Sequence, residues 1–484
     1  MLQLGLKTNV LILASWLCCA PAPVSAQRPP ESADAHLARA RALAAAAKLP
    51  EATAEMRRAV ALGPKRADLH DALGTLLVQQ NDLDGATTEF EKALRLNPEL
   101  ASAHLRLGVL RFEQGQFELA EEHLSKANRL GPGNILALNY LGRTLREIGK
   151  FPEAVQAFQA SLEIEPGQAE ILSLLGQSWQ RAGNPVEAAE AFRKVLALEP
   201  QNAEAENNLG LALLQSGDGD AAIAAFRAAL AIRPGDIGFE VNFGAAYLQK
   251  ADFTAAVKTF RQALARAPGN QVLHYNLGLA LKLQDKLPEA VEELRLAESL
   301  DPNQPDAPYT LGVTLWQMGD LDGSAAELKK AIQAKPDYAE AHYTLGTVLK
   351  QQGKLEESAR ALREAIRIEP DFAGAHTTLA GVLRQSGDDQ GASVEAKLGA
   401  ELAKQKTDLQ AAIFATNSGR RLRRVGDLDG AVSQFRAAIR AVGDYAPAHF
   451  ELAIALRQMG QNEEGALELK KAAALDPKLV APRQ

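Results

Sequence analysis

The chain of 484 residues is rich in alanine, leucine, glutamate, glutamine and arginine, and only 5% of its residues are aromatic. This composition favours helices throughout. Its 53 basic and 60 acidic residues give a net charge of −7 without a long block of either sign. The charges therefore give no reason to expect a nucleic-acid partner or binding to anionic membranes.

The first 26 residues form a predicted signal peptide. Lys7 is the one basic residue before the apolar run "VLILASWLCCA" at residues 10–20, which is too short to span a bilayer as a permanent helix. Val24 and Ala26 match a small-residue cleavage site, so we expect cleavage before Gln27, export, and no stable membrane span afterwards. In a bacterium the product would be periplasmic or extracellular. A retained membrane anchor is the alternative.

Both cysteines lie inside this predicted signal peptide. Cys18 and Cys19 follow Trp16 and Leu17, and these bulky residues argue against a lipoprotein signal, which needs small residues before its cysteine. The mature chain would contain no thiol, and so neither a disulfide nor a cysteine–metal site. This suits an oxidising compartment.

A strict repeat governs the rest of the sequence. Prolines recur every 34 residues from Pro64 to Pro370, and glycines recur with the same period from Gly74 to Gly346. Small residues form a third series from Ala86 to Ala392. A period of this length indicates an array of identical structural units that stack on one another.

One unit, residues 339–372, predicts a pair of helices. In "AEAHYTLGTVLKQQ", Leu345 and Leu349 share one helical face. Gly353 ends this first helix because glycine adopts the left-handed conformation without steric cost. "LEESARALREAIRI" is the second helix, and Pro370 cannot continue it.

The packing of each pair follows from two residue classes. We expect small residues such as Gly346, Ser358 and Ala365 where adjacent helices approach most closely. The large inward residue of the second helix recurs as Phe90, Phe158, Phe192, Phe226, Phe260 and Phe435. One pair cannot bury both its faces, so neighbouring units must stack into an all-α solenoid.

The unit resembles a tetratricopeptide repeat, with small residues at positions 8 and 20, glycine at 15, alanine at 27 and proline at 32. The predicted organisation is a signal peptide at 1–26, a short polar leader at 27–32, eleven copies at 33–406, an insertion at 407–411, two copies at 412–479 and a tail at 480–484. The resemblance implies a right-handed superhelix of about thirteen 34-residue repeats, with the first helices lining a concave groove.

The repeat register fails once, near residues 407–411. Lys404 stands where the next proline is due, and Gly387 and Gly426 are 39 rather than 34 residues apart. Neither glycine nor proline interrupts residues 400–418. We therefore expect one long helix, and a rotation of the last two copies relative to the first eleven.

Two patterns invite a metal interpretation. Seven histidines occupy position 4 of a unit, but no cysteine and no neighbouring carboxylate recurs with them, so we interpret them as packing residues with a polar tip. The motif Asp-x-Asp-Gly occurs at residues 82–85, 320–323 and 427–430, without the remaining ligands of a calcium loop. Its first aspartate is placed to cap the second helix. We expect neither a metal nor a cofactor.

No hydrolase elbow, phosphate-binding loop or HExxH motif occurs, and the segments outside the repeats are too short for a catalytic domain. We therefore expect a chain that is not an enzyme. The resemblance extends to the repeat arm of O-linked N-acetylglucosamine transferase, without its catalytic domain.

The family resemblance places groove residues at positions 2, 5, 6, 9, 12 and 13. Asn208, Asn242 and Asn276 at position 6 resemble the asparagine ladder of that transferase arm, which grips a peptide backbone. Ala72, Arg106, Tyr140 and Leu174 break the ladder in the N-terminal half. The other candidates are tyrosines at position 5 and a set rich in cations at or beside position 12: Tyr275, Tyr309, Tyr343, Lys282, Trp316, Lys350, Arg384, Arg420, Arg423, Arg424 and Arg457.

These residues predict that copies 7–13 bind an acidic or polar extended segment, because aromatic residues and cations are enriched at interface hot spots. An ordinary solvated helix face is the alternative for the cations. Position 5 never holds lysine, which argues against the family's chaperone-type carboxylate clamp.

The predicted function is an exported, non-enzymatic scaffold that binds protein or peptide partners. A cell-envelope assembly factor for polysaccharide or protein export is a second interpretation. A carbohydrate-binding or regulatory repeat protein, in which tyrosine and tryptophan stack on sugars, is a third.

Overall fold

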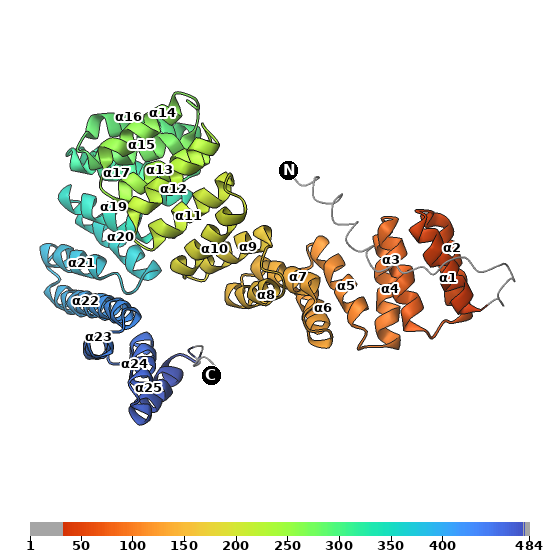
Figure 1. Cartoon of the computed structure of the whole chain (residues 1–484). Coiled ribbons are helices and arrows are strands. Elements are labelled where there is room, and N and C mark those ends of the chain that lie inside the picture. Colours follow the sequence, from red (N-terminus) through yellow and green to blue (C-terminus); the bar gives the residue numbers. More distant parts are fainter. Residues whose placement is uncertain (1–31, 478, 480–484) are drawn as a thin grey trace. The chain divides into compact units, whose positions relative to one another are not determined.

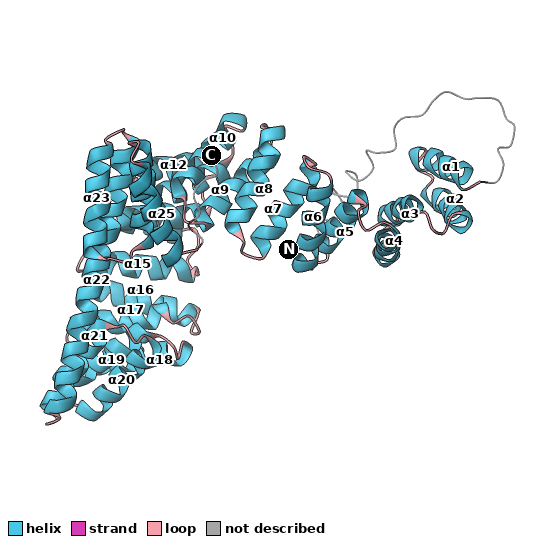
Figure 2. Cartoon of the chain, turned by 90° about the horizontal axis from the view of Figure 1, so that it is seen from below, coloured by secondary structure: helices cyan, strands magenta, loops and turns pink. Residues whose placement is uncertain are grey.

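The computed structural model describes residues 32–477 and 479, and these residues form 25 helices and no strand (Figures 1 and 2). The predicted signal peptide and the leader up to residue 31 lie outside the described residues. The all-α repeat fold expected from the sequence is confirmed. Among residues 32–477, no helix combines the length and the apolar character that crossing a membrane requires.

The chain divides into two compact bodies, and helix α14 (Phe253–Leu264) contains the division between Thr259 and Phe260. The N-terminal body contains the helices α1 Ala33–Ala45, α2 Leu49–Leu62, α3 Ala67–Gln79, α4 Leu83–Leu96, α5 Ala101–Glu113, α6 Phe117–Leu130, α7 Ile135–Glu147, α8 Phe151–Ile164, α9 Ala169–Arg181, α10 Pro185–Leu198, α11 Ala203–Gln215, α12 Gly219–Ile232 and α13 Ile237–Gln249. Each helix packs against the next.

The C-terminal body continues the same pattern of pairs. Its helices are α15 Gln271–Leu283, α16 Leu287–Leu300, α17 Asp306–Gln317, α18 Leu321–Ala334, α19 Ala339–Gln351, α20 Leu355–Ile368, α21 Ala373–Gln385, α22 Asp389–Arg424, α23 Leu428–Ala441, α24 Ala446–Gln458 and α25 Asn462–Leu475. The first helices of successive copies, such as α15, α17, α19 and α21, also contact one another and form a shared face.

The turn inside each pair depends on backbone conformation at position 15. Gly353 has φ +74° there, as the sequence predicted, and a positive φ recurs at this position in every copy, whether the residue is glycine or not. Asp82, Asp320 and Asp427 accept hydrogen bonds from the backbone N–H three residues later. They cap the second helices, as the Asp-x-Asp-Gly motif predicted.

The core of each pair is built from the predicted small and large residues. A Cβ atom added to Gly74 would lie 2.6 Å from the Phe90 ring, and one added to Gly346 would lie 2.6 Å from Leu362. The hydroxyl of Ser358, which is fully buried, donates a hydrogen bond to Gly346 O at 2.6 Å. The six recurring phenylalanines are fully buried. Glycine at position 8 therefore lets the second helix approach closely enough for a large side chain to fill the core.

Helix α22 extends without interruption across the break in the repeat register (Figure 2). Its 36 residues replace the second helix of copy 11 and the first helix of copy 12. Its N-terminal part packs on α21 and its C-terminal part on α23 and α24. The rotation of the last two copies stays a prediction.

A carboxylate does recur beside the position-4 histidines, so the prediction that none does is wrong. His36, His70, His274, His376 and His449 each place Nδ1 2.5–2.7 Å from a glutamate 19 residues further along the chain. These glutamates lie on the second helix of the same copy, so the pairs become visible only when the two helices fold together. The pairs connect helices, and among the described residues no cluster of three or more His, Cys, Asp or Glu could hold a metal ion.

Candidate binding faces

The clearest set of available cations lies on the first helices of the C-terminal body. Lys282 on α15, Lys350 on α19 and Arg384 on α21 occupy position 12 of their copies. Within the described part of the chain, none of the three side chains forms a hydrogen bond or an ion pair. Because α15, α17, α19 and α21 contact in sequence, these side chains follow one row across neighbouring helices.

The two lysines of this row are partly removed from water. Lys282 is half-buried, and burial lowers the pKa of its ammonium group. Lys350 lies over the backbone of α21, since a Cβ atom added to Gly381 would come 2.7 Å from Lys350 Nζ. An ammonium group that is partly removed from water and has no carboxylate partner is stabilised when an anion approaches it.

Trp316 on α17 interrupts the row of cations with an aromatic side chain. Its Nε1 donates a hydrogen bond to Gln351 Oε1 at 2.8 Å, which connects α17 to α19. The indole also packs against the buried cluster that contains Leu345 and Leu349. Trp316 is therefore partly structural, and its remaining surface lies between the positions of Lys282 and Lys350.

The three predicted tyrosines also pack partly into the junctions between copies. Tyr309 contacts Tyr338 with ring centroids 4.9 Å apart, and Tyr343 contacts Phe372 at 4.8 Å. Tyr275 shares a side-chain hydrogen bond with Thr310, and burial raises the pKa of Tyr275. Each ring is only half-buried, so one part of it remains open to a partner.

The C-terminal arginines fall into two groups. Arg420 Nε and Arg423 Nη2 lie 2.7 and 3.1 Å from the carboxylate of Glu451, a buried residue of α24. Both arginines therefore hold α22 against α24. Arg424 and Arg457 are exposed and have no ion-pair partner among the described residues, so they remain available.

The predicted asparagine ladder is largely engaged within the protein. In the N-terminal body, Asn242 Nδ2 donates to Asn207 Oδ1 at 2.9 Å, and Asn207 Nδ2 lies 3.5 Å from Asn208 Oδ1. In the C-terminal body, Asn276 Nδ2 donates to Val272 O of its own helix at 2.8 Å. A peptide backbone would have to displace these bonds.

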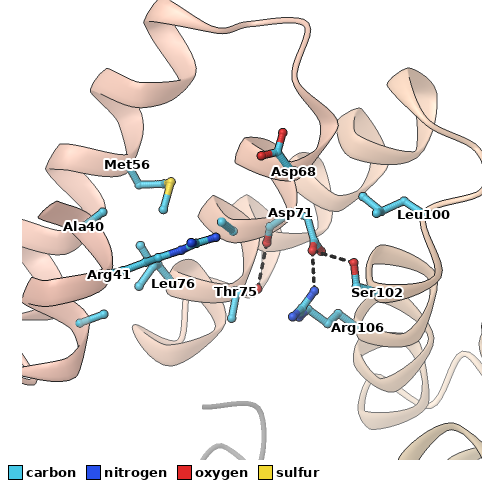
Figure 3. A pocket seen from close by; sticks show the side chains of 12 residues that line it. Ala40, Arg41, Met56, Asp68, Asp71, Thr75, Leu76, Leu100, Ser102 and Arg106 are labelled. Atoms are coloured by element: carbon cyan, nitrogen blue, oxygen red, sulfur yellow. Dashed lines mark hydrogen bonds and ion pairs between the residues drawn. The ribbon is translucent and has the colours of Figure 1, made fainter. Parts of the chain in front are cut away.

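The N-terminal body contains a cavity that the sequence did not single out. It has a volume of about 250 Å³ and lies between α1, α3 and α5, with Met56 of α2 at one wall (Figure 3). Ala40 and Ala44 of α1 and Ala72 of α3 form part of its apolar lining. Asp71, Ser102 and Arg106 supply the polar side.

Asp71 determines the electrostatics of this cavity. Its Oδ2 accepts from Arg106 Nη1 at 2.5 Å and from Ser102 Oγ at 2.9 Å (Figure 3). Asp71 is only 8% exposed, and its Oδ1 is buried without a hydrogen-bond partner. The guanidinium group of Arg41 lines the same cavity and has no ion-pair partner in the described chain.

A buried acceptor without a partner costs free energy until a donor, from water or from a ligand, reaches it. Ala72 and Arg106, which line this cavity, are two of the residues that break the asparagine ladder. The signal that could have identified the cavity was alanine at positions 8 and 12 of copy 1 and at position 6 of copy 2, which are Ala40, Ala44 and Ala72.

Comparison with protein families identifies the repeat. A sequence profile described as "Tetratricopeptide repeat" matches residues 72–135, 174–237, 241–305, 309–371, 343–396 and 416–479, and a second profile of the same description matches residues 111–178. The matches cover more than half of the chain. It belongs to the tetratricopeptide repeat family.

Solved structures of other proteins match parts of this chain. YrrB, described as a TPR protein with an unusual peptide-binding site, is 23% identical, and the match covers 38% of this chain and 94% of YrrB with a TM-score of 0.37. A tetratricopeptide repeat protein from Parabacteroides merdae is 17% identical over 51% of this chain and 98% of its own, with a TM-score of 0.44. MamA from Desulfovibrio magneticus is 25% identical, and the match covers 35% of this chain and 96% of the MamA chain with a TM-score of 0.33. Sequence comparison with curated proteins found no match.

Proposed function

We propose that this tetratricopeptide repeat protein is an exported, non-enzymatic scaffold that binds protein or peptide segments on the shared faces of its first helices. Family membership supports a role in protein interaction. In the C-terminal body the preferred partner is an acidic or polar extended segment.

The row of Lys282, Lys350 and Arg384 carries this proposal. An extended chain spans about 3.3 Å per residue, and neighbouring first helices lie roughly 8–10 Å apart. Carboxylates about three residues apart in a bound segment would therefore meet Lys350 and Arg384 on neighbouring first helices, and Lys282 lies two helix spacings from Lys350. Trp316 between them offers the aromatic contact that is common at interface hot spots.

Charge reversal tests the proposal. The variant Lys350→Glu/Arg384→Glu should weaken binding of a labelled peptide that repeats Glu-Ser-Ser by at least about tenfold, because attraction becomes repulsion. Fluorescence anisotropy measures the affinity of the full processed chain. A matched control, Lys329→Glu/Arg363→Glu, makes the same charge change at exposed positions of the second helices α18 and α20.

The control should bind the acidic peptide nearly as well as the unmodified chain. Equal binding by all three proteins would refute the C-terminal face as the binding site. Cross-linked affinity capture in the native compartment, with the same three proteins, then identifies the natural partner.

Export is the second part of the proposal and rests on the sequence of residues 1–26. N-terminal sequencing of protein recovered from its native host should give Gln27 as the first residue. Recovery of an unprocessed chain in the cytosol would show that export is wrong.

A further inference from the structure

The N-terminal cavity has an equivalent place two repeats further along the chain. Ala44 and Ala72 of the cavity correspond to Phe112 and Tyr140, two repeat lengths later. Phe112 and Tyr140 contact edge to face, with ring centroids 5.4 Å apart and an interplanar angle of 84°. The chain thus fills this space with its own aromatic side chains in copies 3 and 4.

In copies 1 and 2 the same space is empty because both positions hold alanine. Tyr140 is 9% exposed, so the equivalent place accommodates a nearly buried aromatic ring. The cavity volume of about 250 Å³ remains where the two rings are missing. The fold therefore already shows which kind of side chain this location accepts.

The polar groups around the cavity also favour an aromatic occupant. Arg143 lies over the Tyr140 ring with its Cζ 6.0 Å from the centroid, and Arg41 and Arg106 border the open cavity. A guanidinium group near a ring face is attracted to it electrostatically. Asp71 Oδ1, buried and without a partner, offers an acceptor to an O–H or N–H group that arrives with the ring.

We propose that the cavity between α1, α3 and α5 binds an aromatic side chain, tyrosine or tryptophan, of an extended peptide segment, and that Asp71 Oδ1 accepts a hydrogen bond from that segment (Figure 3). This second site deepens the proposed peptide-binding function and rests on it. Its chemistry differs from that of the C-terminal face, because it selects an aromatic residue rather than a series of carboxylates.

Saturation-transfer NMR on the full processed chain tests this site. The probe is the uncharged peptide acetyl-Gly-Ser-Gly-Tyr-Gly-Ser-Gly-amide, compared with the same peptide carrying alanine in place of tyrosine. The tyrosine ring protons should receive saturation from the protein, and the alanine peptide should bind at least about tenfold more weakly. Comparable binding of both peptides would refute an aromatic site.

The variant Ala72→Tyr fills the cavity as Tyr140 does in copy 4 and should abolish the ring-proton signal. Ala44→Phe narrows the same cavity from α1 and provides an independent second variant. Ala42→Tyr adds the same side chain at an exposed position of α1 that does not line the cavity and serves as the matched control. Unchanged ring-proton signals in Ala72→Tyr and Ala44→Phe, with helical circular dichroism retained, would overturn the proposal.

The two binding proposals fail independently. Lys350→Glu/Arg384→Glu should leave binding of the tyrosine peptide unchanged, since both residues belong to the C-terminal body. Loss of acidic-peptide binding alone therefore concerns the C-terminal face, and loss of tyrosine-peptide binding in Ala72→Tyr alone concerns the cavity.

Discussion

His70 and Glu89 connect the two helices of copy 2, with His70 Nδ1 2.5 Å from Glu89 Oε2. The other ring nitrogen, Nε2, lies 3.1 Å from Pro64 O, which belongs to the preceding copy. One imidazole thus joins both helices of its own copy and the turn before them. Both contacts are partly or fully shielded from water, since His70 is 6% exposed.

His70→Ala should destabilise copy 2 by about 1–3 kcal/mol, because Pro64 O loses its donor and Glu89 loses one of its two partners, keeping only Lys92. Hydrogen exchange of the α3 and α4 amides measures the local loss. The matched control is His342→Ala, since His342 contacts Pro336 O but has alanine, Ala361, where the glutamate would stand. An equal effect at both sites would show that the glutamate contact contributes nothing.

Copy 3 differs from this arrangement because His123 stands where glutamate stands in copy 2. His104 Nδ1 and His123 Nδ1 are 3.0 Å apart. Burial lowers the pKa of His104, and burial together with the His104 imidazole lowers the pKa of His123 to about 4. The unfolded chain therefore binds more protons than the folded chain below the ordinary histidine pKa of about 6.5, and copy 3 loses stability as the pH falls from there to about 4.

His123→Glu should remove this acid-induced loss. Glutamate at this position would pair with His104, and Lys126 lies three residues later, as Lys92 does after Glu89. Hydrogen exchange of α5 and α6 amides at pH 4.5 and pH 7 measures the change, and His123→Gln is the uncharged control. An unchanged difference between the two pH values in His123→Glu would contradict the assignment.

The glutamates of the histidine pairs take up protons at a lower pH than that at which the histidines of copy 3 affect stability. Burial acts to raise the pKa of Glu89 and Glu468, but Lys92 with His70 and Lys471 with His449 outweigh it and hold both values below normal. Their stabilising contribution is thus complete above the unfolded glutamate pKa and is lost as the pH falls through the lower folded value.

The repeat architecture could be read from the sequence because its determinants are local and periodic. Gly346 and Leu362 must contact in any helix pair of this type, and their spacing is visible within one unit. The pairing of His70 with Glu89 was missed although both residues belong to one copy. Their 19-residue separation is meaningful only after the turn at Asn81 brings the two helices together.

The candidate sites were only partly predictable for a related reason. The position-12 cations could be selected from the repeat frame, yet Arg423 is neutralised by Glu451 of the next copy, whereas Lys350 is not. Whether a cation is available depends on neighbours in other copies. The cavity at Ala72 is lined by residues of three copies. Its volume could not be predicted from the short side chains in the sequence, because it exists only where α1, α3 and α5 pack together.

Position 15 offers a stabilising substitution. Ala251 adopts φ +57° in the turn between α13 and α14, a conformation that costs a residue with a Cβ atom roughly 1 kcal/mol. Ala251→Gly should therefore stabilise the turn by about 0.5–1 kcal/mol, measured by the urea midpoint or by local hydrogen exchange. Gly217→Ala makes the reverse change at the same position of the preceding copy, where φ is +87° and no atom lies within 4 Å of the added Cβ. It should destabilise by a similar amount, and stabilisation by Gly217→Ala would contradict the backbone explanation.

Lys404 occupies the place where the repeat would next have a proline, and it lies inside the uninterrupted helix α22. Lys404→Pro would remove a backbone donor from the helix interior and place the proline ring against the carbonyl of Ala400, at a cost of about 3 kcal/mol or more. The exposed middle of α22 has few neighbours to resist this break, so we expect a loss of far-UV helical signal and new protease cleavage near residue 404. Lys404→Ala removes the same charge without breaking the helix and should behave like the unmodified chain.

If Lys404→Pro kept full helicity and protease resistance, an uninterrupted α22 would not be required to connect the last two copies to the rest of the C-terminal body.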